Sequence, residues 1–278
     1  MSVLLFTLLV LIGSLLAGFL GSLTGLGGGV VIVPLLALVF HVDMRYAIGA
    51  SLVSVIATSS GAASAYVREG FSNMRIGMFL EIATTVGAIV GAIIATRVTT
   101  ATIAIIFGFV LIYSAYLSVR SQPAHSINEP QDPLARVLHL DGDYPTAQGL
   151  QPYTVHRIPL GFGLMFGAGT LSGLLGIGSG AVKVLAMDQA MRVPFKVSTT
   201  TSNFMIGVTA AASAGVYLAR GYIDPGIAMP VVLGALAGSM LGAKVLVNAR
   251  TKYLRVVFSA VIVLLGFEMI FNGFTGRL

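Results

Sequence analysis

Apolar residues are grouped along the chain into ten runs that are separated by short polar or charged stretches. The runs cover residues 3–23, 26–40, 47–66, 76–96, 101–119, 158–175, 178–191, 197–218, 226–247 and 253–272. Most of them have about the 20 residues that an α-helix needs to cross a bilayer, and the second and seventh are shorter. This pattern predicts an all-α integral membrane protein with eight to ten membrane-spanning segments.

The composition narrows the class of protein further. Only 9% of the 278 residues are charged, whereas soluble domains carry about a quarter. This excludes an ordinary soluble enzyme, a disordered chain and a coiled coil. The chain has no cysteine, which excludes thiolate metal sites and cysteine nucleophiles. Its net charge of +6 comes from cations scattered singly between the apolar runs, so we expect no nucleic-acid partner. We also expect no catalytic residue, metal or cofactor.

The two halves of the sequence are related. Shifting the sequence by 151 residues aligns them without a gap for about 90 positions. Gly25, Gly27 and Gly29 fall on Gly176, Gly178 and Gly180, Ser51 falls on Ser202, and Thr58 falls on Thr209. We infer a duplication, with a first membrane repeat at 1–119 and a second at 158–278. Internal repeats of this kind are typical of secondary transporters.

The arginine and lysine residues indicate how the repeats are oriented. If all ten runs cross the membrane, ten of these cations lie on one side and four on the other. If the two short runs turn back instead, the same cations divide seven to seven. The positive-inside rule favours the first arrangement. Five crossings in each half make the repeats inverted, with both termini outside and residues 120–157 in the cytoplasm.

Residues 120–157 separate the two repeats and lie outside the membrane. We expect a strand at 137–140, a turn at 141–143 and a partner strand at 153–156, which together form a small hairpin. Three of the four histidines lie in this stretch. They indicate either a metal site or, as we prefer, exposed loop side chains without fixed geometry.

Two glycine clusters, Gly25–Gly29 and Gly176–Gly180, each precede one of the short runs. So much glycine is expected to break a membrane helix and to free backbone N–H groups at the start of the next one. Free N–H groups at a helix start favour an anion. The alternative is close helix packing through small residues, which suits the pairs Gly87/Gly91 and Gly238/Gly242.

Lys183 lies inside an apolar run, one turn after the second glycine cluster. A cation is unfavourable both within a membrane and near the start of a helix, and a bound anion relieves both penalties. The alternatives are a side chain that extends to the membrane surface, or a structural pair with Asp188 or Glu81. Glu81 itself either reaches water near the start of its run or couples transport to protons.

Hydroxyl side chains follow one helical face in each half. Ser51, Ser54 and Thr58 do so in the first half, and Thr199, Ser202, Thr209 and Ser213 do so in the second. Such groups either bond to their own helix backbone or line a polar pathway. Their repeat-equivalent positions favour the pathway for at least part of the set.

The glycine clusters and their flanks resemble the TauE/SafE sulfite exporter family, also described as the 4-toluene sulfonate uptake permeases. The motif is Gly25-Leu-Gly-Gly-Gly29 followed by Pro34-Leu35, and the second half carries Gly176-Ile-Gly-Ser-Gly180 and a later Pro194–Asn203 stretch. The resemblance implies a secondary transporter of small sulfur-containing anions such as sulfite, sulfonates, sulfoacetate or thiosulfate. Export is the commoner activity in this family, although some members perform uptake. In the second motif Ser179 replaces a glycine and Leu185 the proline, so we expect the anion contact mainly there.

The predicted site is therefore an anion site between the two glycine breaks, in a multi-pass protein of the cytoplasmic membrane. Its expected contacts are backbone groups of Gly27, Gly28, Gly29, Gly178, Ser179 and Gly180, side-chain donors from Ser51, Thr58, Ser202, Asn203 and Thr209, and the charge of Lys183. The expected mechanism is alternating access, and the expected partners are a small anion and the lipid bilayer. A homo-oligomer is one of the oligomeric states that the sequence allows. The alternatives are a carboxylate or other small-anion carrier, an anion channel, and a membrane scaffold.

Overall fold

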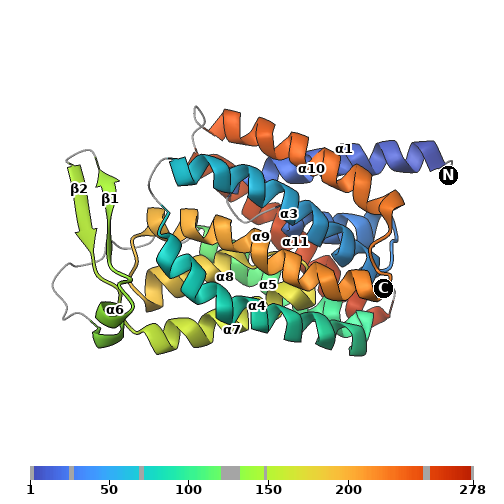
Figure 1. Cartoon of the computed structure of the whole chain (residues 1–278). Coiled ribbons are helices and arrows are strands. Elements are labelled where there is room, and N and C mark those ends of the chain that lie inside the picture. Colours follow the sequence, from blue (N-terminus) through green and yellow to red (C-terminus); the bar gives the residue numbers. More distant parts are fainter. Residues whose placement is uncertain are drawn as a thin grey trace.

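The computed structural model describes residues 3–24, 28–68, 72–119, 132–146, 149–246 and 251–276. Each of the ten apolar runs is helical there, and the helix ends lie within three residues of the predicted ones (Figure 1). The long helices are α1 (Val3–Thr24), α3 (Met44–Arg68), α4 (Met74–Arg97), α5 (Thr100–Val119), α7 (Ile158–Leu175), α9 (Phe195–Ala219), α10 (Pro225–Leu246) and α11 (Thr251–Thr275).

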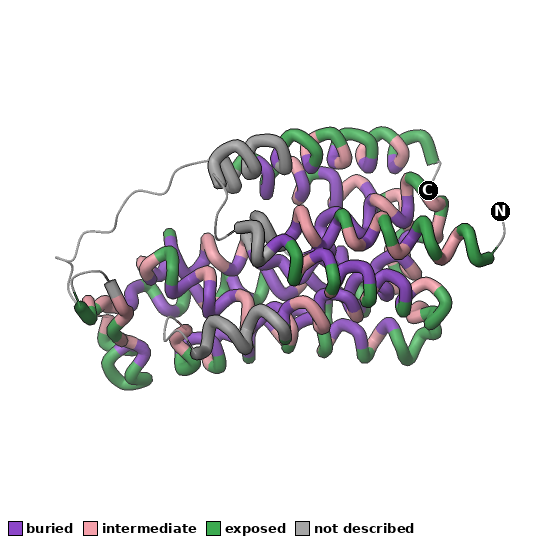
Figure 2. The backbone as a smooth tube through the Cα atoms, turned by 90° about the horizontal axis from the view of Figure 1, so that it is seen from above, coloured by how far each residue is buried: buried purple, intermediate pink, exposed green. Residues whose placement is uncertain are grey.

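Within the described residues, five helical segments are long and apolar enough to cross a membrane. They are Val3–Gly21, Met74–Arg97, Ile158–Leu175, Phe195–Ala219 and Pro225–Gly242, and shorter apolar helices cover Gly29–Val39, Thr100–Tyr116 and Ser259–Thr275. The outer surface of the bundle carries large apolar side chains, as on α11, where Phe267, Phe271 and Phe274 are exposed. Exposed residues lie along the outer sides of the helices, and buried residues lie between them (Figure 2). Such a surface suits a lipid environment, and the chain is an all-α multi-pass membrane protein.

The two short runs have the same unusual construction. Helix α2 (Gly29–Pro34) continues into the π-helical turn η1 (Leu35–Val39), and α8 (Gly180–Leu185) continues into η2 (Ala186–Ala190). Each pair spans about 16 Å at 1.5 Å per residue, roughly half of the hydrocarbon core. In each copy a residue with positive φ lies two positions beyond the π-helical turn, His41 in one and Arg192 in the other.

The helices of the two halves interlock. The first helix of each half packs most extensively against the fourth helix of the other, α1 against α10 and α7 against α4. Helices α5 and α11 form a further pair, and α3 packs against α9. The two halves therefore share one interior rather than forming two separate lobes.

Glycines make the closest of these helix contacts. A Cβ atom at Gly87 or Gly91 of α4 would overlap a backbone carbonyl oxygen of α7, and a Cβ atom at Gly238 of α10 would overlap one of α1. The expectation that these glycines allow close helix packing is confirmed.

A small unit of one short helix and two strands precedes α7. It consists of α6 (Pro133–Val137) and the antiparallel strands β1 (Gly142–Thr146) and β2 (Gly149–Tyr153). The predicted strand at 137–140 is wrong. Of the predicted partner strand at 153–156, only Tyr153 lies in a strand, as the last residue of β2. The Asp132 carboxylate accepts a hydrogen bond from the Leu134 amide (2.9 Å), which starts a helix that Pro133 suits. This unit lies at one end of the molecule, and both chain termini lie at the opposite end (Figure 1).

Candidate functional site

The two glycine breaks meet in the interior of the protein. At the start of α2, a Cβ atom on Gly29 would lie 2.8 Å from Ser51 Oγ and 2.9 Å from the carbonyl oxygen of Gly176. Gly28 and Gly29 are buried, and Gly27 lies outside the described residues. The structure thus brings the first break, α3 and the second break together, although they are far apart in the sequence.

The second break has a left-handed backbone. Gly176 and Gly178 have φ values of 70° and 71°, which glycine adopts without a steric penalty. Ser179 has a φ of 47°, a conformation that is uncommon for a residue with a side chain. Its buried hydroxyl has no hydrogen-bond partner among the described residues. The replacement of a glycine by Ser179 therefore places an unused polar group at the break.

Two of the predicted hydroxyl contacts stabilise the breaks. Ser51 Oγ donates to the carbonyl oxygen of Gly176 (2.8 Å), and Ser202 Oγ donates to that of Gly180 (3.3 Å). The hydroxyl of Thr58 bonds instead to the Ser54 carbonyl oxygen of its own helix (3.0 Å), as the alternative interpretation expects. Asn203 is half-buried on α9, beside Ser202.

Three side chains from both halves are joined by hydrogen bonds and form the charged centre of the protein. Lys183 Nζ on α8 donates to Thr209 Oγ1 on α9 (2.5 Å), and that hydroxyl donates to Glu81 Oε1 on α4 (2.6 Å). Thr85, one turn beyond Glu81, donates a second hydrogen bond to the same carboxylate oxygen (3.2 Å). The Lys183 side chain is 0% exposed and Glu81 is 7% exposed.

This geometry decides between the interpretations of the two charges. Lys183 does not extend to the membrane surface, because it is fully buried. Glu81 is also largely buried, and it pairs with Lys183 through the hydroxyl of Thr209. Asp188, the other acid considered for Lys183, is buried on η2. The sequence singled out all three side chains and named Glu81 as one of two candidate partners of Lys183, but it did not indicate that Thr209 bridges them.

The charged centre retains unused bonding capacity. An ammonium group carries three N–H donors, and Thr209 is the one acceptor of Lys183 among the described residues. Glu81 Oε2 is buried and has no hydrogen-bond partner in the same part of the chain. Buried polar groups are normally satisfied, so such groups call for an explanation. Unused ammonium donors in an apolar interior suit an oxyanion.

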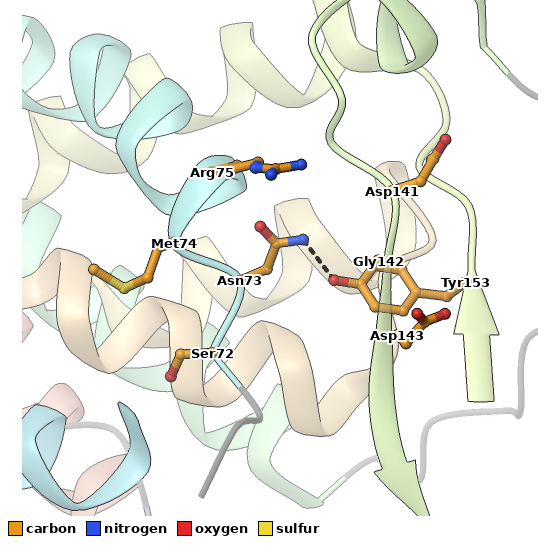
Figure 3. A pocket seen from close by; sticks show the side chains of 8 residues that line it. All are labelled: Ser72, Asn73, Met74, Arg75, Asp141, Gly142, Asp143 and Tyr153. Carbon is orange, nitrogen blue, oxygen red and sulfur yellow. Dashed lines mark hydrogen bonds between the residues drawn. The ribbon is translucent and has the colours of Figure 1, made fainter. Parts of the chain in front are cut away.

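A cavity lies between the start of α4 and the hairpin, at one end of the bundle. It has a volume of about 330 Å³ and is lined by Ser72, Asn73, Met74, Arg75, Asp141, Gly142, Asp143 and Tyr153 (Figure 3). Asn73 holds its wall together, because its amide donates to Tyr153 Oη (2.7 Å) and to the Leu140 carbonyl oxygen (3.0 Å). Its side-chain oxygen caps α4 by accepting from the Ile76 amide (3.1 Å). Burial raises the pKa of the Tyr153 phenol above its ordinary value of 10.

No pattern in the sequence indicated this cavity. Asn73 is recognisable only as a helix cap, and its contacts to the hairpin depend on the tertiary structure. In the described ranges, no group of three or more His, Asp or Glu side chains lies close enough to hold a metal ion. His156 contacts the Thr154 hydroxyl (3.0 Å).

Comparison with known proteins gives a family for the chain. Residues 10–269 match the family described as sulfite exporter TauE/SafE. The probable membrane transporter protein YunE of Bacillus subtilis (strain 168) is 30% identical over 277 residues, which cover 96% of this chain and 98% of YunE. A probable membrane transporter protein of Methanocaldococcus jannaschii is 25% identical over 282 residues, with 96% of each chain covered. No solved structure gives a significant match.

Proposed function

Because this chain belongs to the sulfite exporter TauE/SafE family, we propose that it is a secondary transporter that exports small sulfur-containing anions across the cytoplasmic membrane. Its relatives are named as probable membrane transporters. The substrate class comprises sulfite, sulfonates, sulfoacetate and thiosulfate. The observation that carries the proposal is the fully buried Lys183, which has unused donors between the two halves of the protein.

We further propose that the halves are inverted repeats with five membrane passes each. Arg45, at the start of α3, donates to the carbonyl oxygen of Val98 (3.0 Å) and lies over the ring of Tyr222. The His156 amide donates to the carbonyl oxygen of Met191 (3.0 Å). If α2 and α8 returned to the side they came from, the Arg45–Tyr222 and His156–Met191 contacts would each join opposite sides of the membrane, whereas the Arg45–Val98 bond fits either arrangement. Five passes place the partners of each contact on the same side.

The substrate site that we propose lies between α2, α8 and the charged centre. Lys183 supplies the charge, and the Ser179 hydroxyl and the backbone around Gly178–Gly180 are the nearest further donors in sequence. Ser51 and Ser202 support this site by holding the broken backbone, and we no longer expect Thr58 to contact substrate. The described residues of the breaks are buried. Access from either side therefore needs a movement of one repeat against the other.

Counterflow in proteoliposomes tests the proposed function. Vesicles that contain the protein and unlabelled sulfite should accumulate labelled sulfite transiently, and Lys183→Ala should abolish this accumulation. The matched control is Lys196→Ala, which removes an exposed lysine from the first turn of α9 and should leave counterflow unchanged. Current without counterflow would contradict a carrier and indicate a channel. Counterflow with carboxylates alone would overturn the substrate class.

Thermal unfolding separates a binding role of Lys183 from a structural one. A ligand that binds the folded state raises the unfolding temperature. Sulfite, thiosulfate, sulfoacetate, taurine, sulfate and carboxylates form the panel. Stabilisation by sulfur oxyanions in the native protein, and its loss in a folded Lys183→Ala variant, are expected. If Lys183→Ala removes stability and transport together, Lys183 has a structural role.

A further inference from the structure

On the basis of the proposed function, we infer that the Glu81 carboxylate competes with the substrate anion for Lys183, so that one monovalent anion crosses the membrane together with one proton. The inference depends on the contact that joins these two charges. Thr209 Oγ1 lies 2.5 Å from Lys183 Nζ and 2.6 Å from Glu81 Oε1. The carboxylate is therefore held one hydroxyl group away from the ammonium, where it supplies the counter-charge that a bound anion would otherwise supply.

Charge balance follows from this arrangement. In the empty protein the ammonium and the carboxylate sum to zero. A monovalent anion beside Lys183 makes the centre net negative, which is unfavourable inside the membrane. Protonation of Glu81 returns the sum to zero. A divalent anion leaves one negative charge even then, so the centre favours monovalent anions.

Few other charges act on Glu81. Its own helix α4 packs against α7, which has no titratable side chain, and against α9. The titratable residues of α9 are Lys196 in its first turn and Tyr217, two turns beyond Thr209. The α8–η2 segment contributes Lys183 and the buried Asp188. The start of α4 carries Arg75, about two turns before Glu81. The hairpin unit beside it carries Asp141, Asp143 and Tyr153.

The proton moves in a defined cycle. When the site opens to one side, the Glu81 carboxylate takes a proton from water, an O–H bond forms, and the anion binds Lys183. When the site opens to the other side, the anion leaves and the carboxyl group returns its proton to water. The carboxylate then accepts again from Thr209, and the neutral empty protein can reorient. Glu81 Oε2, which is buried and unpartnered among the described residues, is the oxygen available for the proton.

The test measures anion flux and proton flux separately in proteoliposomes that enclose a pH-sensitive dye. The probes are isethionate, which is monovalent, and sulfoacetate, which is divalent. Net isethionate movement should carry protons in the same direction, one for each anion. Sulfoacetate should move more slowly and, at one proton per anion, should carry net charge. Net movement of an anion without proton movement contradicts the inference and leaves the proposed function intact, whereas neither net movement nor counterflow of either anion contradicts both.

Two variants of Glu81 sharpen the test. Glu81→Gln is always neutral, so it should retain isethionate counterflow, while its net isethionate flux should no longer carry protons. Its empty form leaves Lys183 without a counter-charge, so net flux should fall by about tenfold or more. Glu81→Asp keeps the carboxylate and should restore proton movement. The matched control is Glu268→Gln, which neutralises an exposed acid on α11. Proton movement that persists in Glu81→Gln would overturn the inference.

Discussion

At the residue scale, Ser51 and Thr58 show how similar hydroxyls on one helix differ in their energetic roles. Ser51 joins α3 to the broken end of α7, whereas Thr58 bonds within α3. Ser51→Ala leaves the buried carbonyl oxygen of Gly176 unpaired, which costs about 1–3 kcal/mol. Thr58→Ala should change the free energy of unfolding by about 0.5 kcal/mol or less. Thermal unfolding of both variants in detergent checks this, and equal losses would contradict the role assigned to Ser51.

The sequence identified the charged residues, but not the hydrogen bonds that connect them. Lys183 is conspicuous because a cation in an apolar run is unfavourable. Glu81 is conspicuous for the same reason, and Thr209 because it is the repeat counterpart of Thr58. Thr209 and Glu81 are 128 residues apart in the sequence, and no local pattern relates them. Only the packing of α4 against α9 brings them together.

At the scale of the helical elements, the contact between α4 and α7 depends on glycine. A Cβ atom on Gly173 would overlap the carbonyl oxygen of Ala88, while a Cβ atom on Gly167 of the same helix would meet no atom within 4 Å. Gly173→Ala should therefore destabilise the protein by about 1–3 kcal/mol. Gly167→Ala should be neutral or stabilising by up to about 1 kcal/mol, because alanine favours the helix. Unfolding in detergent compares the two, and a tolerated Gly173→Ala would show that the helices separate at little cost.

Helices and strands were not equally predictable. Long apolar runs define membrane helices because the bilayer fixes their length and composition. The hairpin is harder, since its strands contain Pro145 and Pro152, residues that normally weaken a strand assignment. Each strand has only one neighbour, so each is an edge strand in which proline is tolerated. The π-helical ends of the short runs have no recognisable sequence signal, and they emerge only in the structure.

At the scale of the whole molecule, the two halves of the duplicated sequence are joined through their first helices. Helix α1 packs with α10 and α7 packs with α4, so neither half buries its own first helix. The charged centre has the same character, because Glu81 comes from one half and Lys183 from the other. A movement between the repeats would change the distance between these two charges. The constant offset in the sequence predicted the repeats, but the packing of one half against the other is visible only in the contacts of the structure.

The orientation of the molecule can be tested directly because the chain has no cysteine. Asp143→Cys places a thiol on the hairpin, and Arg220→Cys and Thr99→Cys place thiols at the opposite end, all at exposed positions. With five passes in each half, a membrane-impermeant maleimide should label positions 99 and 220 in intact cells, and position 143 only after the membrane is opened. If the short runs returned to their own side, positions 143 and 220 would lie on the same side. Equal labelling of these two positions would therefore contradict the inverted repeats, and the opposite pattern of labelling would place the hairpin outside the cell.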